Sequence, residues 1–433
     1  MSALAVSAGT ARASRKQPIF AFSALVALIM VLQFSPIAGL IGFRLSGNGA
    51  WSLIGVARDA LVVTLAAGVL LQSALSVRRS RWRGSTAWAM ATLLVLGALA
   101  AASSADAASI ALNLRRLLLF PLLSLAVIWA QLSPKQVALL LRLILGTTVI
   151  VAVLGILEYF APDALWSDYF KVVDYFSSNP FDPFGALPFN ESGRFFTWDW
   201  QNWTGGPIRR AVSTYLEPTT LAAALMCGTC LASAARRAHQ PAASLKLVLL
   251  VTCGILTLSK AFVLFLIILV AYIGWGIPSP RRLVSLTVAG CAIALAAQSL
   301  DLTEGMFAHI GGLATAIDHV VRGSILGDGL GNAGNYAAEG ADLDIGAESG
   351  LGNLLAQVGI VAFLYIIWIQ QLATDILQSA RERRDRSGVF FAGMILSWYV
   401  SFLFSASSLG IGGNALTFMA VSLYLHKNYV GHR

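Results

Sequence analysis

Residues 137–160 read VALLLRLILGTTVIVAVLGILEYF, a run of 24 residues in which Arg142 and Glu158 are the only charged side chains. The run is long enough to cross the hydrocarbon core of a bilayer as a helix. Backbone groups in lipid must be hydrogen-bonded internally, and the run lacks the alternating pattern of a barrel strand, so a helix is the only spanning structure open to it. We expect the protein to be built from such helices.

The same apolar character extends over the chain, which has 433 residues, of which 57% are hydrophobic and 12% charged. The mean hydropathy is +0.73. A water-soluble protein of this composition would expose far too much apolar surface. The sequence therefore predicts an all-α polytopic membrane protein that forms a single integral domain over residues 1–433. Twelve spans are expected, at residues 19–42, 53–77, 87–102, 113–131, 137–160, 212–232, 245–258, 261–277, 283–300, 351–372, 389–405 and 411–425.

Basic and acidic residues alternate between the links that join these spans. The two termini and the links after every second span hold 19 Lys or Arg against 3 acidic residues, whereas the other face holds 9 against 17. Cytosolic links of membrane proteins are enriched in Lys and Arg, which places both termini in the cytosol, together with a basic loop at about residues 374–388 that contains RERRDR. The net charge of +9 then reflects topology, and no nucleic-acid partner is expected.

Two large loops are expected on the opposite, outer face, at about residues 161–210 and 301–350. The first interleaves aromatic side chains such as Trp166, Phe195 and Trp203 with aspartates. Flat aromatic faces beside carboxylates suit the binding of sugar rings. An aromatic belt at the membrane surface, with a small core for the loop itself, explains the same residues, and both interpretations stay open.

The second outer loop concentrates polar residues and carries the glycine cluster GDGLGNAGN at 327–335. Gly329, Gly331 and Gly334 have the spacing GxGxxG, but no strand precedes them and no crossover helix follows, which argues against dinucleotide binding. A glycine-rich turn can still bind phosphate through its backbone N–H groups.

The four cysteines, Cys227, Cys230, Cys253 and Cys291, lie in apolar segments. Cys227 and Cys230 have CxxC spacing, but no second pair or nearby histidine completes a metal site. We expect small helix-packing residues and no bound metal.

Charged residues at the edges of the outer face are the candidates for a functional site. Lys260 interrupts TLSKAFVLF between two short apolar spans, and Arg209 and Arg210 open the segment RRAVSTYLEP, which also contains Glu217. Burying such charges is expensive unless they are paired. A lysine that reaches the interface and arginines that act only as anchors are the alternatives.

Four segments, taken in this order, resemble the O-antigen polymerase and ligase superfamily. They are RRAVSTYLEPTTLA at 209–222, LTLSKA at 256–261, ILGDGLGNAGN at 325–335 and ESGLGNLLAQVGIVAFL at 348–364. The resemblance covers roughly residues 110–425. Within the superfamily the chain looks most like polymerases of secreted bacterial exopolysaccharides, of the xanthan type.

The resemblance implies glycosyl transfer on the outer face of the bacterial inner membrane. The implied substrates are an undecaprenyl-diphosphate-linked oligosaccharide and the growing polysaccharide, with no cofactor, metal or nucleotide sugar. A co-polymerase that regulates chain length is a further implied partner.

Two departures from the family pattern bear on these implications. Where the family commonly has Ser-Arg, this chain has Ser259 and Lys260, which keeps the charge but loses bidentate geometry. Where ligases carry His-Asn, this chain has Glu348 and Ser349. The second departure favours a polymerase over a ligase and argues against a histidine base.

The chemistry of the implied reaction agrees with the distribution of charge. Breaking the bond between an anomeric carbon and a lipid diphosphate releases negative charge, so the site needs fixed cations and a base for the incoming hydroxyl. A role for Glu348 as a helix cap is the structural alternative. The predicted catalytic residues are Glu348, Arg322 and His309, and the predicted substrate-binding residues are Arg209, Arg210, Glu217 and Lys260.

Two other classes of function stay open. A flippase or exporter would move the same lipid-linked sugar, and such transporters carry ionisable groups inside the membrane. Arg58, Asp59 and Arg142 are candidates for that role, although Arg58 and Asp59 could simply pair with each other. A nonenzymatic assembly scaffold is the third reading, and the large outer loops favour an enzyme.

Overall fold

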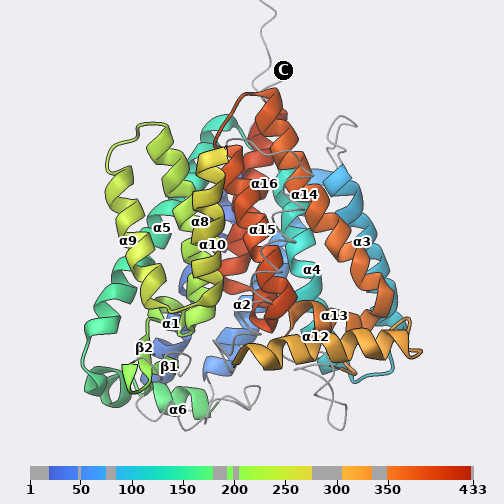
Figure 1. Cartoon of the computed structure of the whole chain (residues 1–433), viewed down its shortest axis with the longest axis horizontal. Helices are drawn as coiled ribbons and strands as arrows, with labels where there is room; N and C mark the ends of the chain where they lie inside the picture. The colour runs from blue at the N-terminus through green and yellow to red at the C-terminus, as the bar shows by residue number, and fades with distance from the viewer. Residues whose placement is uncertain are drawn as a thin grey trace, which may run out of the picture.

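The structure is a computed structural model that describes residues 19–46, 50–74, 84–178, 193–197, 204–275, 305–333 and 349–430. Most helices run side by side between two ends of the molecule (Figure 1). In the described part, six helical segments are long and apolar enough to cross a membrane: Phe20–Ser46, Gly84–Ala102, Ala107–Trp129, Pro134–Phe160, Pro218–Arg237 and Gly350–Glu382. The chain is therefore an all-α protein with the helices of a membrane-embedded protein.

The helices of the bundle are α1 (Ile19–Ser46), α2 (Ala50–Ala74), α3 (Gly84–Ala102), α4 (Ala107–Trp129), α5 (Pro134–Phe160), α8 (Pro218–Arg237), α9 (Ala243–Leu256), α10 (Lys260–Trp275), α13 (Gly350–Val358), α14 (Ala362–Glu382), α15 (Gly388–Phe404) and α16 (Gly412–Val430). Short links join most of the bundle helices that follow one another, except between α5 and α8 and between α10 and α13. Smaller elements lie at one end of the bundle: the π-helical turn η2 (Leu165–Tyr169), α6 (Val172–Ser177), β1 (Phe195–Thr197), β2 (Ile208–Arg210), the 3-10 turns η4 (Ser213–Tyr215), η5 (Gly359–Val361) and η6 (Ala406–Leu409), and α12 (Gly305–Val321).

Local sequence sets where several helices begin. The carboxylate of Asp106 accepts hydrogen bonds from the N–H groups of Ala108 and Ser109, both at 2.9 Å, and caps α4. Hydrogen bonds from Ser109 lower the pKa of Asp106. Ser133 and Gln136 form a reciprocal capping box at the start of α5. Each cap satisfies backbone donors that the first turn of a helix leaves unpaired.

The core is centred on α16, whose residues 413–426 are all buried. Aromatic rings from three other helices pack against it: the ring of Phe418 lies 4.7 Å from that of Phe120 in α4 and 5.3 Å from that of Trp368 in α14. Trp398 of α15 approaches Phe418 edge-on at 4.8 Å. Close van der Waals packing of this kind holds helices together where apolar surroundings remove the hydrophobic driving force.

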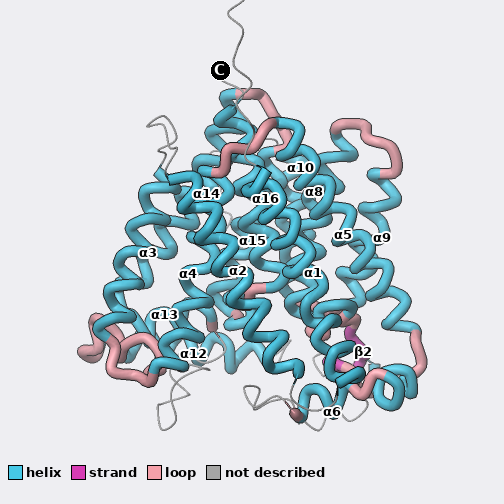
Figure 2. Tube along the Cα trace, turned by 180° about the vertical axis from the view of Figure 1, so that it is seen from behind, coloured by secondary structure: helices cyan, strands magenta, loops and turns pink. Residues whose placement is uncertain are grey.

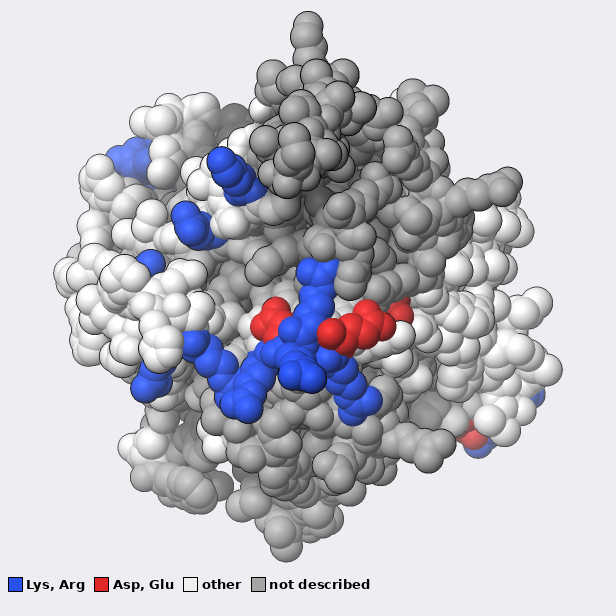
Figure 3. Space-filling view, turned by 90° about the horizontal axis from the view of Figure 1, so that it is seen from above, with Lys and Arg blue, Asp and Glu red and all other residues white. Residues whose placement is uncertain are grey.

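The links between the helices lie at two ends of the bundle. The α8–α9 and α14–α15 links lie at one end, which we call the basic end, and β1, β2 and the α9–α10 link lie at the other, the hairpin end (Figure 1). Viewed from the basic end, Lys and Arg side chains gather near the centre of the described surface, with a few acidic side chains beside them (Figure 3).

Two expected segments differ from the structure, and a third is not described by it. The segment at 212–232 becomes helical only at Pro218, because Ser213–Tyr215 forms the 3-10 turn η4. The segment at 351–372 breaks at Gly359 and then continues to Glu382, so residues 374–382, expected in the basic loop, are helical. The span at 283–300 lies outside the described residues.

The second expected outer loop contains a helix. α12 lies across the hairpin end, transverse to the bundle (Figures 1 and 2). Gly312 and Ala316 are buried, His319 and Val320 are partly buried, and most of the opposite face is exposed. A helix with one apolar face can lie along an apolar surface. The polar residues and glycines of such a helix interrupt the apolar pattern of the sequence, and for this reason the sequence predicts a loop here.

We predict that Gly359→Ala disrupts the junction between α13 and α14. Gly359 has φ 56° and ψ −136°, a conformation almost restricted to glycine, which costs other residues about 1 to 3 kcal/mol. A Cβ there would also lie 1.9 Å from the carbonyl oxygen of Ile325. The measurement is thermal unfolding of the purified protein in detergent.

Gly97→Ala is the matched control. Gly97 lies inside α3, and a Cβ there meets nothing within 4 Å. Alanine is the better helix former by about 1 kcal/mol, so this variant should unfold at or slightly above the temperature of the unchanged protein. Equal unfolding temperatures for the two variants would contradict the role of Gly359.

Candidate functional site

A two-stranded hairpin is fastened to the end of α5 by a buried arginine. Strands β1 and β2 are antiparallel, with Phe196 opposite Arg209. Arg194, which directly precedes β1, is 0% exposed and forms ion pairs with Glu158 and Asp163. The Glu158 carboxylate also accepts a hydrogen bond from the N–H of Val212, at 3.0 Å, so one carboxylate joins both sides of the hairpin. Sequence reasoning missed this pair, because its partners lie 36 residues apart with no motif between them.

Arg209 and Arg210 are adjacent on β2 and have different surroundings. Arg209 donates to the carbonyl oxygens of Tyr159 and Ala161, at 3.0 and 3.2 Å, and pairs with Asp163. It therefore acts as an anchor on the carbonyl end of α5, where a cation is favoured by the helix dipole. This geometry corresponds to the anchoring role that was the alternative to substrate binding for Arg209.

Arg210 lies against the turn between α9 and α10. Its Nε donates to the carbonyl oxygen of Thr257, at 2.9 Å. The N–H of Ala211 donates to the carbonyl oxygen of Leu256, also at 2.9 Å. Lys260 begins α10 three residues after Thr257 and is partly buried, so it belongs to the same α9–α10 turn that Arg210 contacts.

Non-glycine residues with left-handed backbone surround this contact. Ser213 has φ 50°, Leu216 has φ 58° and, in the facing turn, Leu258 has φ 49°. Side chains larger than glycine adopt this region at a cost, and such residues persist where the surrounding structure holds them and cluster at functional sites. The Ser213 hydroxyl donates to the carbonyl oxygen of Val151 at 2.7 Å, and the Tyr215 hydroxyl donates to Oε1 of Gln33 at 2.8 Å.

Glu217 marks the start of α8. Its carboxylate accepts hydrogen bonds from the hydroxyls of Thr219 and Thr220. A Cβ on Gly412, the first residue of α16, would lie 2.4 Å from Cγ2 of Thr220, so the starts of α8 and α16 are in close contact. A carboxylate is favoured at such a place by the partial positive charge of helix N-termini.

The start of α13 joins the same region. Ser349 caps α13 by accepting from the N–H of Gly352 at 2.9 Å, and its hydroxyl donates to the carbonyl oxygen of Leu403 at 2.7 Å. A Cβ on Gly350 would lie 2.8 Å from the hydroxyl of Ser408 in η6. The N-terminal ends of α8, α13 and α16 therefore lie close to η6, and the partial positive charge of helix N-termini can attract anions.

The remaining predicted catalytic residues are placed as follows. Arg322 donates from Nε to Asp318 at 2.9 Å, and the two side chains are 78% and 55% exposed. Through residues 325–333 this end of α12 is joined to the α3–α4 link, on the far side of the hairpin end from β1 and β2 (Figures 1 and 2). His309 belongs to α12, but its side chain lies outside the described residues, and Glu348 lies outside them altogether.

The described part of the glycine cluster packs on α13. The N–H groups of Asp328 and Gly329 donate to the carbonyl oxygens of Ala356 and Gln357, at 2.9 and 3.0 Å. The N–H of Gly331 donates to Oε1 of Gln357 at 3.2 Å. These donors are occupied, so a phosphate could take them only by displacing the loop from α13.

Two cysteines of the CxxC spacing pack between helices. The thiols of Cys227 and Cys230 are buried and point to the carbonyl oxygens of Leu416 and Phe390, at 3.6 and 3.3 Å. They serve helix packing, as small polarizable side chains do.

We predict that Arg194→Ala destabilises the hairpin end. Removing one partner of a buried ion pair leaves the other charge uncompensated and costs about 3 to 5 kcal/mol. Arg322→Ala is the matched control, because its exposed pair with Asp318 contributes about 0 to 1 kcal/mol. Thermal unfolding and the rate of proteolysis in the segment after β1 measure both effects. Equal unfolding temperatures and equal proteolysis rates for the two variants would argue against a stabilising role of the Arg194–Glu158 pair.

Two comparisons of the chain with known proteins found no match. No protein-family model matches the chain. No curated protein matches it either. The functional assignment therefore depends on the residues and geometry described above.

Proposed function

We propose that this protein is a glycosyltransferase that polymerises undecaprenyl-diphosphate-linked oligosaccharide repeat units into an exopolysaccharide. The observation that carries the proposal is the meeting of Arg210 with the turn before Lys260, beside the gathered N-termini of α8, α13 and α16. Fixed cations and helix N-termini suit a diphosphate, whose negative charge grows as it leaves. Lipid diphosphates reach such a place from the bilayer.

The proposed reaction joins two lipid-linked sugars. The oxygen of an incoming sugar hydroxyl forms a bond to the anomeric carbon, while the bond from that carbon to the diphosphate breaks and its electron pair leaves with the diphosphate. Arg210 and Lys260 stabilise the leaving charge. The hydroxyl proton passes to a base, for which Glu348 is our first assignment and His309 the second.

The proposed topology has twelve spans, with both termini and the basic end in the cytosol. The excess of Lys and Arg over acidic residues in alternate links of the sequence supports this orientation. It places the hairpin end, with Arg210 and Lys260, on the outer face of a bacterial inner membrane. The growing polysaccharide and a co-polymerase that regulates chain length would meet the protein on that face.

One observation favours a flippase or exporter as the second candidate. Asp59 of α2 forms an ion pair with Arg115 of α4, and the side chains are only 12% and 22% exposed. Arg115 lies about 12 Å along α4 from its first residue, at a helical rise of 1.5 Å per residue. Charges inside a bundle are typical of transport pathways. A single pair that joins two neighbouring helices also has a purely structural explanation.

We predict that Arg210→Gln lowers repeat-unit coupling by about 10²- to 10³-fold, the usual effect of removing one preorganised group that stabilises developing negative charge. The assay measures coupling of lipid-linked repeat units by purified protein in detergent. Because detergent provides no two separated compartments, activity in this assay would distinguish a polymerase from an exporter.

Arg209→Gln is the matched control for this experiment. Arg209 is adjacent on the same strand, but it contacts the end of α5. This variant should lower the yield of folded protein and leave the coupling rate per folded molecule nearly unchanged. An Arg210→Gln rate within threefold of the unchanged protein would remove the site assignment.

We predict that Glu348→Gln nearly abolishes coupling and leaves substrate binding intact. A general base supplies about 10²- to 10⁴-fold in rate, and glutamine keeps the shape but cannot take the proton. Glu348→Asp should retain part of the activity. If Glu348→Gln couples repeat units as fast as the unchanged protein, the base assignment moves to His309.

A further inference from the structure

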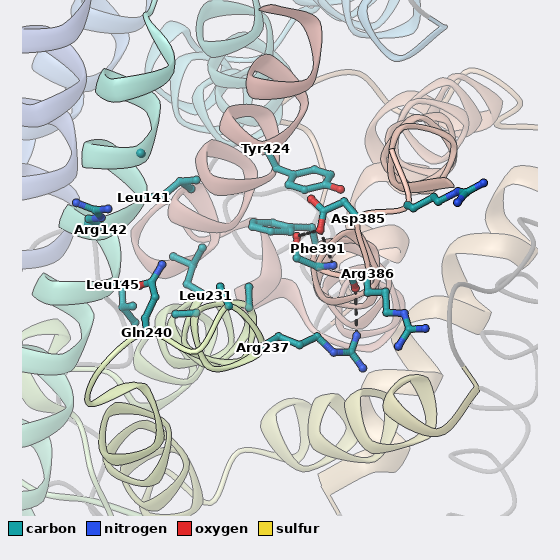
Figure 4. Close-up of a pocket in the computed structure, with 16 residues that line it drawn as sticks. Leu141, Arg142, Leu145, Leu231, Arg237, Gln240, Asp385, Arg386, Phe391 and Tyr424 are labelled. Carbon is teal, nitrogen blue, oxygen red and sulfur yellow. Dashed lines mark hydrogen bonds between the residues drawn. The ribbon is translucent and has the colours of Figure 1, made fainter. Parts of the chain in front are cut away.

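A cavity of about 600 Å³ lies at the basic end, remote from the hairpin end. It is bounded by α5, α8 and the link between α14 and α15 (Figure 4). The part that faces the bundle is apolar and includes Leu141, Leu145, Leu231 and Phe391. A site of this size and lining can bury a substantial part of an amphipathic ligand.

Four arginines line the same cavity. Arg142 lies on one side of the leucines, and Arg237 and Arg386 lie on the other, with Arg384 on the same link as Arg386 (Figure 4). All four residues are exposed. Among the described residues, no carboxylate lies within ion-pair distance of Arg142, Arg384 or Arg386.

The one acidic residue of the lining is already engaged. The carboxylate of Asp385 accepts from the N–H and the hydroxyl of Ser387, at 2.9 and 2.7 Å. Arg237 is held in place, because its Nη1 donates to the carbonyl oxygen of Arg386 at 3.4 Å and its guanidinium lies 5.4 Å from the ring centre of Phe390. The cavity therefore presents an excess of positive charge on a partly fixed frame.

Arg384 has a left-handed backbone conformation at the cavity. It has φ 53° and follows Arg383, the C-cap of α14, in a Schellman motif, with the N–H of Asp385 donating to the carbonyl oxygen of Ala380 at 2.9 Å. Glycine is the usual residue at this left-handed position because it has no Cβ. An arginine here accepts a conformational cost and places a cation at the cavity.

The charged and apolar parts of the cavity follow one another along α5. Arg142 lies about 12 Å along α5 from its first residue, at 1.5 Å per residue, and Leu145 lies nearly one turn deeper. A ligand with its charge at Arg142 would thus have its apolar part beside the leucines. Guanidinium groups match phosphate oxygens in pairs, and basic pockets between membrane helices on the cytosolic side bind anionic headgroups.

We propose that this cavity binds the phosphate headgroup of an anionic glycerophospholipid, with its arginines on the phosphate and its leucines against the upper acyl chains. The proposal concerns the opposite end of the molecule from the glycosyl-transfer site and does not depend on it. The occupant is a lipid of the surrounding leaflet, selected by its negative charge.

The test measures lipid binding by delipidated full-length protein in detergent, by native mass spectrometry and thermal shift. The probes are phosphatidylglycerol, phosphatidylcholine with the same acyl chains, and inorganic phosphate. Phosphatidylglycerol should bind and raise the unfolding temperature more than the other two. Arg142→Gln and Arg384→Gly should each weaken its binding about fivefold, the contribution of one cation near an anionic membrane surface.

The choice of variants separates binding from folding. Glycine suits the left-handed backbone at residue 384, so Arg384→Gly should fold at least as well as the unchanged protein. Arg236→Gln is the control, because Arg236 is exposed in the same last turn of α8 but does not line the cavity. Equal binding of the two lipids, an equal effect of inorganic phosphate, or equal weakening by Arg236→Gln would each overturn the proposal.

Discussion

The whole structure depends on the requirement that backbone N–H and C=O groups in apolar surroundings be hydrogen-bonded within the protein. The long apolar segments meet it as helices, and irregular backbone gathers at the two ends (Figure 1). Where α13 and α14 separate at Gly359, the exposed N–H of Ile360 is satisfied by the carbonyl oxygen of Ile325, at 2.9 Å. The segment after α12, which includes the glycine cluster, therefore completes the backbone hydrogen bonding where the helix is broken between α13 and α14.

Charge at the hairpin end is arranged by the same requirement. Helix α5 ends at Phe160 with carbonyl groups that have no partner in the helix, and Arg194 and Arg209 supply donors to them. The carboxylate of Glu158 neutralises the charge of the buried Arg194. It also accepts a hydrogen bond from the N–H of Val212, just after β2. With these contacts made by its neighbours, Arg210 is positioned against the α9–α10 turn, and this division of roles underlies the proposed site.

Left-handed backbone at non-glycine residues occurs at both ends of the bundle. Ser213, Leu216 and Leu258 surround the contact between β2 and the α9–α10 turn, and Arg384 lies at the basic cavity. Each of these conformations costs free energy that the surrounding contacts must offset. A glycine would remove the cost at Arg384, and the arginine there adds a cation to the cavity. The two proposed sites thus lie at opposite ends of the molecule, one for a reacting lipid diphosphate and one for an anionic phospholipid.

The sequence by itself determined the helical class, the approximate positions of most apolar helices and the difference in charge between the two ends, because these follow from local hydropathy and from counting charges along the chain. It also singled out Arg210, Lys260 and Glu217, since charges stand out in apolar segments. Only the tertiary structure decided that Arg194 pairs with Glu158, that Asp59 pairs with Arg115, and that four arginines from three segments line one cavity. Such pairings join residues far apart in the chain, and local sequence carries no signal for them because they arise from the packing of helices against one another.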